Sequence, residues 1–375
     1  MPEFPEPAIL TLPGTHDPDG PHDPPIEMSV HSTGEGGDRP PVVFCHGFPD
    51  LAYSWRHQLA AVADAGFTAI APAQRGYGAT SAPEDVDAYG LGQLCGDLAD
   101  MLDVLSIDKA IVVGHDWGGF VAWAMPALHP DRVEAVVGVC TPYTPFPDTE
   151  FLRAMFGDDD KMYMLWFQKP EVPEATMDPQ VRLLFERLMV GGVDPARLIE
   201  AQMARAEGMD FNPFRSIEDL EPMGEPIASP EELDHYVEVF ERTGFRGGIN
   251  WYRNMDTNAA AYPHAGTTPL RIPTLMITAE WDPALPSRMF VNRTEGGHWL
   301  QVSVDGAAIG EPVVGTIVEV FEPGRPGDDD ALLARREIVV STGYGAGVAP
   351  VAHIGLGART EVDVVVTTPG GRELA

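Results

Sequence analysis

Short apolar stretches and amphipathic stretches alternate along the first part of the chain. The apolar stretches are β-branched or alternate with polar residues, and they lie at 26–31, 41–45, 67–73, 110–113 and 133–140. Helical periodicity follows three of them, at 53–65, at 91–105 and from 118 onwards. Strands that alternate with helices predict a doubly wound, mostly parallel sheet with helices packed against it.

The pattern changes between residues 144 and 268, where helical periodicity dominates. Helices are predicted at 161–167, 179–190, 195–207 and 230–243, and several begin at Pro or just after Ser or Asp. A strand-like stretch returns at 272–282. We therefore interpret the helical part as a lid inserted between two strands of one sheet.

Towards the C-terminus the alternation of helices and strands ends. Short β-rich stretches, separated by Gly and Pro, lie at 299–304, 313–321, 336–341, 351–354 and 361–367. They predict a small all-β module. The predicted parts are a flexible arm (1–25), an α/β core in two pieces (26–143 and 269–289), a lid (144–268) and the β-module (290–375).

The charge of the chain is strongly unbalanced. Acidic residues number 57 against 24 basic ones, which gives a net charge of −33. Such a surface disfavours nucleic acid and anionic membranes as partners. A high-salt habitat and a GC-rich genome would each account for this composition.

Cysteine content and hydropathy bear on the location of the protein. Cys45, Cys95 and Cys140 are odd in number and lie in apolar contexts, which indicates reduced thiols and a cytoplasmic protein. The acidic, proline-containing N-terminus does not resemble a signal peptide. The spacing of the three cysteines fits no metal motif, and the sequence predicts neither a metal nor a cofactor.

A candidate nucleophile lies in the turn between the 110–113 strand and the following helix. Asp116 stands within Gly-His-Asp-Trp-Gly-Gly, and a reactive residue between glycines at a strand–helix turn is typical of the nucleophile elbow of α/β-hydrolases. A carboxylate is already ionised at neutral pH, so its attack on carbon would give an alkyl-enzyme ester. That chemistry suits epoxides and alkyl halides. The simpler alternative is a structural turn in which Asp116 caps the helix.

Residues 40–290 resemble the α/β-hydrolase-fold epoxide hydrolases. The motifs that carry the resemblance are HGFP at 46–49, GHDWGG at 114–119, YMLWFQ at 163–168, WYRNM at 251–255 and TAEWD at 278–282. The resemblance implies that Asp116 attacks an epoxide carbon. It also implies that Tyr163 and Tyr252, from the lid, hydrogen-bond the epoxide oxygen and supply its proton.

The resemblance further implies roles in the second half of the reaction. The backbone N–H groups of Phe48 and Trp117 would form an oxyanion hole, and their side chains would line an apolar substrate pocket. Asp282 would orient a histidine that activates water. His298, in Gly-Gly-His-Trp, matches that histidine.

The spacing departs from the family pattern near the end of the core. Only residues 283–297 separate Asp282 from His298, whereas a helix of about 11 residues, a strand of about 5 and two loops are expected there. From Phe290 the sequence resembles an ASPIC/UnbV-type β-module instead. The chain therefore resembles a fusion joined near Met289, in which His298 belongs to both patterns.

Three functions remain open at this point. The first is an epoxide hydrolase, a hydrolase acting on ether bonds, that opens a small apolar epoxide to a diol and whose ester hydrolysis the shortened core puts at risk. The second is a haloalkane or haloacid dehalogenase, against which Phe48 and Tyr252 argue. The third is a non-catalytic protein that binds a partner through its β-module. The sequence does not determine the oligomeric state.

Overall fold

The computed structural model describes residues 4–20, 22, 24–157, 160–191, 212–222, 224–278, 290–292, 298–303, 316–338, 351–357, 361–368 and 373–374. Contacts within the chain divide it into two units, Met1–Pro283 and Ala284–Ala375. No helix in these described ranges has both the length and the apolar character that crossing a membrane requires.

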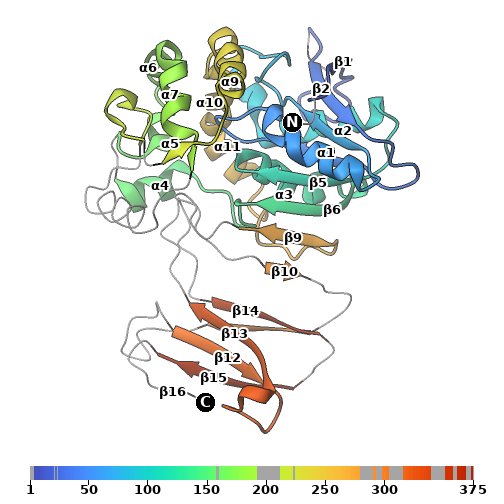
Figure 1. Cartoon of the computed structure of the whole chain (residues 1–375), viewed down its shortest axis with the longest axis vertical. Helices are drawn as coiled ribbons and strands as arrows, with labels where there is room; N and C mark the ends of the chain where they lie inside the picture. The colour runs from blue at the N-terminus through green and yellow to red at the C-terminus, as the bar shows by residue number, and fades with distance from the viewer. Residues whose placement is uncertain are drawn as a thin grey trace. The chain divides into compact units, whose positions relative to one another are not determined.

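A twisted sheet forms the centre of the first unit (Figure 1). Its strands are β1 (Pro7–Thr11), β2 (Glu27–Thr33), β3 (Val42–Cys45), β4 (Ala69–Pro72), β5 (Ala110–His115), β6 (Val133–Val139) and β9 (Thr274–Ile277). They lie in the order β1-β2-β4-β3-β5-β6-β9. All neighbours from β4 to β9 are parallel, whereas β1 and β2 are antiparallel. The predicted doubly wound, mostly parallel sheet is confirmed.

The buried strands carry apolar residues on both faces because helices cover the sheet. The core helices are α1 (Arg56–Asp64), α2 (Leu91–Val104) and α3 (Trp117–Leu128), with 3-10 turns η1 (Ala52–Trp55), η2 (Val86–Tyr89) and η3 (Pro130–Arg132). Along β3 successive side chains point to opposite faces. Val42 and Phe44 pack in one cluster with Leu59 of α1, and Cys45 is fully buried outside that cluster.

The lid helices follow β6 and precede β9 in the sequence. In Figure 1 they are gathered at one end of the sheet. They are α4 (Thr149–Phe156), α5 (Tyr163–Trp166), α6 (Val172–Met177), α7 (Val181–Leu188), α9 (Pro230–Thr243), α10 (Arg246–Arg253) and α11 (Met255–Ala261), with turns η4 (Asp178–Gln180) and η5 (Ile217–Asp219) and a short ribbon of β7 (Val190–Gly191) and β8 (Glu225–Pro226). The predicted helices at 161–167, 179–190 and 230–243 correspond to α5, α7 and α9. The predicted helix at 195–207 lies outside the described residues.

The bounds of α9 could be predicted because residues that start a helix stand at its N-terminus. Ser229 and Glu232 form a capping box, in which each side chain bonds the other residue's backbone N–H, and Pro230 opens the first turn. By contrast, α4, α6, α10 and α11 are short and were not predicted.

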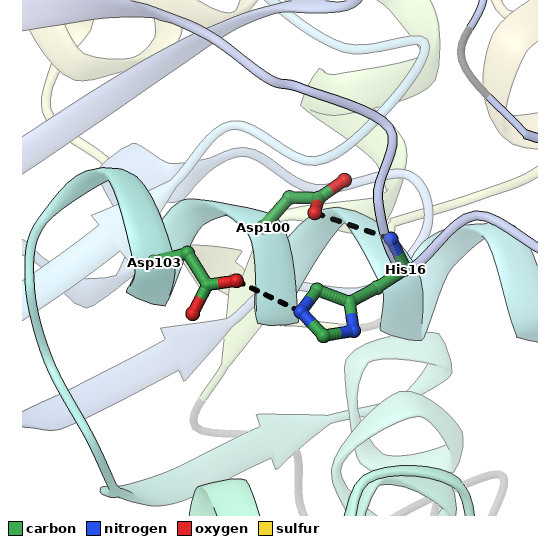
Figure 2. A group of neighbouring side chains, drawn as sticks. All are labelled: His16, Asp100 and Asp103. Carbon is green, nitrogen blue, oxygen red and sulfur yellow. Dashed lines mark hydrogen bonds and ion pairs between the residues drawn. The ribbon is translucent and has the colours of Figure 1, made fainter.

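The stretch for which the sequence predicts a flexible arm is tied to the core over its described residues. Residues 7–11 form β1, which pairs with β2 from Pro7 opposite His31 to Thr11 opposite Glu27. Further along, His16 binds α2 twice: its backbone N–H donates to Asp100 at 3.2 Å and its Nε2 lies 2.8 Å from Asp103 (Figure 2). The Pro- and Asp-rich composition of the arm therefore does not prevent ordered contacts.

The described strands from β11 onwards form antiparallel sheets in the second unit. They are β11 (His298–Ser303), β12 (Thr316–Phe321), β13 (Leu332–Ile338), β14 (Val351–Gly357), β15 (Asp363–Thr367) and β16 (Glu373–Leu374), with a turn η6 (Asp329–Ala331). β10 (Phe290–Asn292) precedes them in the chain and is not part of these sheets. β11 pairs with β14, and β12 pairs with both β13 and β15. Val318, Val320 and Phe321 are buried there. The predicted all-β character of the C-terminal part is confirmed.

Candidate active site

Asp116 occupies the sharp turn between β5 and α3. Its backbone has a φ of 52°, which is unusual for a non-glycine residue, and the Thr141 hydroxyl donates to its carbonyl oxygen at 2.7 Å. Two glycines allow this turn. A Cβ on Gly114 would lie 2.0 Å from the Gly118 oxygen, and a Cβ on Gly118 would lie 2.1 Å from the Cys45 oxygen. Tight packing therefore holds the strained residue in place.

The Asp116 carboxylate points at the backbone of the 46–49 turn. The Phe48 N–H donates to its Oδ1 at 2.8 Å, and the Trp117 N–H also hydrogen-bonds the carboxylate. Gly47 permits this approach, because a Cβ there would lie 2.4 Å from the Asp116 Cβ. The two N–H groups predicted for an oxyanion hole thus converge on the predicted nucleophile.

Electrostatic effects on Asp116 act in opposite directions. Burial raises the pKa of its carboxyl group, whereas the charge of His115 and the hydrogen bonds from Phe48 and Trp117 lower it. Burial is the largest effect, and the pKa lies above the ordinary aspartate value. The two N–H donors stabilise the ionised form that a nucleophile requires.

The two predicted lid tyrosines lie together and beside the elbow. Tyr252, on α10, is 2% exposed; its ring centroid lies 5.6 Å from that of Tyr163, on α5, and a side-chain hydrogen bond joins the two. The Tyr252 ring also lies 5.1 Å from Trp117. Burial, Tyr163 and the Asp116 charge raise the pKa of Tyr252 well above its usual value, so it remains a proton donor.

Aromatic rings form the remaining wall near the carboxylate. Phe48 and Trp117 are both buried, and the Phe48 ring contacts Tyr252 at 5.3 Å, whereas their role in lining a substrate pocket stays a prediction. Phe167 and Phe214 also contact Phe48, at 5.4 Å and 5.9 Å. Neither was predicted as a site residue: Phe167 lies in the YMLWFQ motif but was given no role there, and nothing in the sequence distinguishes Phe214 from an ordinary core aromatic.

His46 lies close to the site but does not have a free nitrogen. Its Nδ1 lies 3.0 Å from the Gly47 oxygen, and its Nε2 accepts from the Gln74 N–H at 3.2 Å. Burial lowers the pKa of this fully buried imidazole. Both ring nitrogens are engaged in holding the 46–49 turn, so His46 supports the oxyanion hole and does not act as a base.

Comparison with known proteins agrees with this geometry. The alpha/beta hydrolase fold family matches residues 40–217. Epoxide hydrolase A of Mycobacterium tuberculosis is 40% identical over 289 residues, which are 75% of this chain and 88% of that protein. The chain belongs to the α/β-hydrolase-fold epoxide hydrolases.

Further epoxide hydrolases show the same relationship. Bifunctional epoxide hydrolase 2 of Sus scrofa is 34% identical over 72% of this chain, which spans 50% of that longer protein. The crystal structure of epoxide hydrolase A from Mycobacterium thermoresistibile superposes with a TM-score of 0.63 at 38% identity, covering 74% of this chain and 83% of that one. A structure of a Vigna radiata epoxide hydrolase mutant superposes with a TM-score of 0.61 at 32% identity. The superposition covers 76% of this chain and 84% of that one.

Two predicted residues of this epoxide hydrolase cannot be placed in the site. Asp282 lies outside the described residues. His298 is the first residue of β11, in the second unit and opposite Gly357 of β14, but its side chain is outside the described part. Their roles as orienting acid and base therefore stay predictions.

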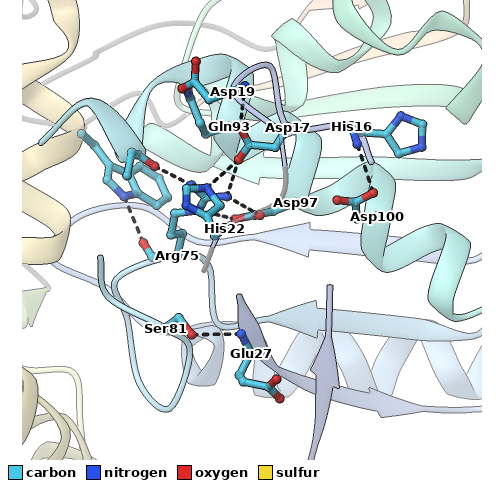
Figure 3. Close-up of polar contacts among 12 residues, drawn as sticks. His16, Asp17, Asp19, His22, Glu27, Arg75, Ser81, Gln93, Asp97 and Asp100 are labelled. Atoms are coloured by element: carbon cyan, nitrogen blue, oxygen red, sulfur yellow. Dashed lines mark hydrogen bonds and ion pairs between the residues drawn. The ribbon is translucent and has the colours of Figure 1, made fainter. Parts of the chain in front are cut away.

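A buried arginine, which the sequence did not single out, fixes the helix that carries Tyr252. Arg75 is 1% exposed and binds Asp97 through two bonds of 2.8 Å and 2.7 Å, and Asp17 of the arm at 3.0 Å (Figure 3). Its carbonyl oxygen accepts from the Trp251 indole at 3.1 Å. The arm and α2 of this epoxide hydrolase thus bind the guanidinium of Arg75, and α10 binds its backbone carbonyl.

One group of side chains has the spacing of metal ligands. Ligand atoms of His16, Asp100 and Asp103 lie within 4.8 Å of one another (Figure 2). Each carboxylate already has partners: Asp103 pairs with Arg132 at 2.7 Å, and Asp100 accepts backbone N–H groups of the arm. We interpret the group as the attachment of the arm to α2.

Proposed function

We propose that this chain opens small apolar epoxides to diols through a covalent ester on Asp116. The observation that carries the proposal is the convergence of three groups: the Asp116 carboxylate, the N–H donors of Phe48 and Trp117, and the hydrogen-bonded pair of Tyr163 and Tyr252. A carboxylate facing two neutral phenols suits a reaction in which an oxygen leaves carbon and must receive a proton.

In the first half, the free Asp116 oxygen attacks an epoxide carbon while the ring C–O bond breaks. The electrons of that bond pass to the epoxide oxygen, which takes a proton from the tyrosine pair and becomes a hydroxyl group. Phe48, Trp117 and the other rings exclude water and hold the apolar body of the substrate. A hydrogen-bond donor at the leaving oxygen is worth about 10²–10³ in rate.

In the second half, water attacks the carbonyl carbon of the ester. His298, oriented by Asp282, takes the proton from that water in our proposal, and the Phe48 and Trp117 N–H groups stabilise the negative charge on the former Oδ1. Collapse expels the diol oxygen, which takes up the proton held by His298. The regenerated Asp116 carboxyl then loses the second proton of the water, which restores the tyrosine pair and the ionised Asp116. The hydrogen bond that already joins the Phe48 N–H to Oδ1 supports this assignment.

Incubation with styrene oxide tests the proposal. We expect diol formation and an adduct of one substrate mass on the peptide that contains Asp116, and neither product in Asp116→Ala. 1-Bromobutane serves as the parallel substrate. Bromide release at a rate equal to epoxide opening would indicate a dehalogenase and contradict the proposal.

We also propose that residues 290–375 are an ASPIC/UnbV-like β-module. The antiparallel strands β11 to β15 and the sequence from Phe290 support it. Limited proteolysis is expected to cut between the two units, near 284–289, and to release a resistant C-terminal fragment. Degradation of the C-terminal part without such a fragment would contradict an independent module.

We propose a cytoplasmic location. Cys45 and Cys95 are buried thiols without a disulfide partner, and burial raises the pKa of Cys45 to about 12, which keeps it unreactive. Fractionation of the source cells tests this: the protein is expected with cytoplasmic markers, and recovery in a secreted fraction would contradict it.

A further inference from the structure

A cavity lies between the arm and the lid, and Asp116, Phe48 and Trp117 are not among its lining residues. It has a volume of about 250 Å³, slightly below the range of about 300–1,000 Å³ usual for ligand pockets. Its apolar lining includes Phe4 of the arm, Leu51 and Tyr53 after the 46–49 turn, and Val239 of α9. The Phe4 and Tyr53 rings meet edge to face, with centroids 5.1 Å apart. The cavity has the size and the surface for a single aromatic ring.

Three groups that can carry positive charge line the same cavity, in a chain whose net charge is −33. They are His31 of β2 and His235 and Arg242 of α9. Arg242 is exposed, and no hydrogen bond or ion pair joins it to another described residue. By comparison, the neighbouring Arg56 is neutralised by Glu232 at 2.7 Å. Arg242 is thus a cation at the cavity that is available to a ligand.

The two histidines are mostly neutral at neutral pH. Burial lowers the pKa of both, and the charges of His31, Arg242 and Arg56 lower that of His235 further, whereas Glu6 raises the pKa of His31 and Glu238 that of His235. His31 Nδ1 lies 2.7 Å from the Pro5 oxygen, so this nitrogen donates and Nε2 is left for a ligand. Two carboxylates oppose an incoming anion: Glu6, on the cavity lining, and Glu238, beside His235.

We propose that this cavity binds a small aromatic monocarboxylate. Its carboxylate pairs with Arg242 and accepts from an N–H of His31 or His235 where that ring is protonated, while its ring packs against Phe4, Tyr53 and Val239. The chemistry favours one negative charge, because Glu6 and Glu238 oppose a second. Asp116, Tyr163 and Tyr252 do not line this cavity, and the Asp116 carboxylate would repel an anion at the candidate active site.

The cavity borders the segment that follows Phe48 and the lid helix α9. Leu51 follows Asp50, whose Oδ1 accepts both the Leu51 N–H and the Tyr236 hydroxyl of α9 at 2.8 Å. An occupant of the cavity would therefore contact both the segment after Phe48 and the lid helix that Asp50 holds. Binding does not require an epoxide, so the proposal stands independently of the reaction at Asp116.

Fluorine NMR with 4-fluorobenzoate tests the proposal on the full chain, and 4-fluorobenzamide is the neutral control probe. We expect the benzoate to bind with a dissociation constant in the millimolar range, about −4 kcal/mol, and the amide to bind at least about tenfold more weakly. Arg242→Gln is expected to weaken benzoate binding about fivefold or more. Arg246→Gln, an exposed arginine that does not line the cavity, should leave it unchanged.

Two further experiments test where the probe binds. Val239→Phe, which fills the cavity, should abolish binding, and saturating diol product should not displace the benzoate. Affinity should rise as the pH falls below about 6.5, because the pKa values of His31 and His235 are lowered and their protonation then adds positive charge; His235→Gln should reduce that rise. Equal binding of the amide, unchanged binding in Arg242→Gln, displacement by the diol, or no binding at about 10 mM would each overturn the proposal.

Discussion

Replacing Tyr252 by Phe removes one hydroxyl group from the proposed proton donor and changes little else. The side chain is 2% exposed and surrounded by aromatic rings, so phenylalanine fills the same space. The lost group is the one that is hydrogen-bonded to Tyr163 and close to the Asp116 charge. We therefore expect the loss of an interaction made mainly in the transition state, with the fold retained.

The magnitude follows from the role. A positioned general acid contributes about 10²–10⁴ in rate. Because Tyr163 remains, we expect the lower end, a reduction of alkylation by about 10², which corresponds to about 2.7 kcal/mol. The double variant with Tyr163→Phe should lose substantially more, since neither phenol of the proposed donor pair is then left.

Rapid quenching measures this step directly. The enzyme is mixed with excess styrene oxide, stopped in acid, and the mass adduct on the Asp116 peptide is followed with time. Tyr89→Phe is the matched control: Tyr89 is 1% exposed and its hydroxyl donates to the Pro83 oxygen at 2.8 Å, remote from the elbow. It should cost about 1 kcal/mol of stability and leave alkylation unchanged. An alkylation rate in Tyr252→Phe within about twofold of the parent would refute the reasoning.

The remaining predictions concern charge and the second half-reaction. Attack needs ionised Asp116, and burial raises the pKa of this carboxyl group, so the alkylation rate should fall as the pH drops through a value above the ordinary aspartate pKa of about 3.9. A rate that is constant down to about pH 4 would contradict this. Arg75→Met leaves buried carboxylates such as Asp97 without their partner and should lower the free energy of unfolding in urea by about 3–5 kcal/mol, whereas Arg325→Met, at an exposed pair, should cost less than about 1 kcal/mol. His298→Gln should retain alkylation and accumulate the ester; normal turnover in this variant would remove His298 from the mechanism.

Local sequence signals were sufficient where local physics decides the structure. The elbow could be predicted because a β-branched strand, glycines and a helical pattern surround Asp116 within a few residues. The same holds for α9, whose capping residues Ser229 and Glu232 stand in the sequence. Neither prediction needed a contact between distant parts of the chain.

Contacts between distant segments explain what was missed. The helix α10 contains Gly247 and Gly248, which disfavour a helix by about 1 kcal/mol each. The fold requires them, because a Cβ at Gly247 would lie 2.3 Å from the Gly76 oxygen, and one at Gly248 would lie 2.3 Å from the Tyr77 hydroxyl. The sequence alone could not show these contacts.

The site itself was predicted in two different ways. Asp116 followed from its own neighbourhood, whereas Tyr163 and Tyr252 could be placed near it only through the resemblance to a family, since they lie on separate lid helices. The Arg75 cluster escaped prediction because its partners Asp17 and Asp97 come from the arm and from α2. Charged residues so far apart in sequence give no signal of being paired.

A single turnover in ¹⁸O-labelled water tests the central claim, that Asp116 forms the covalent ester, most directly. With enzyme in excess over styrene oxide, the account predicts that the first diol contains no label and that one ¹⁸O atom is found in the Asp116 carboxyl group, because water attacks the ester carbonyl carbon. Label in the diol after one turnover, with none in Asp116, would show direct attack of water on the epoxide and contradict the account.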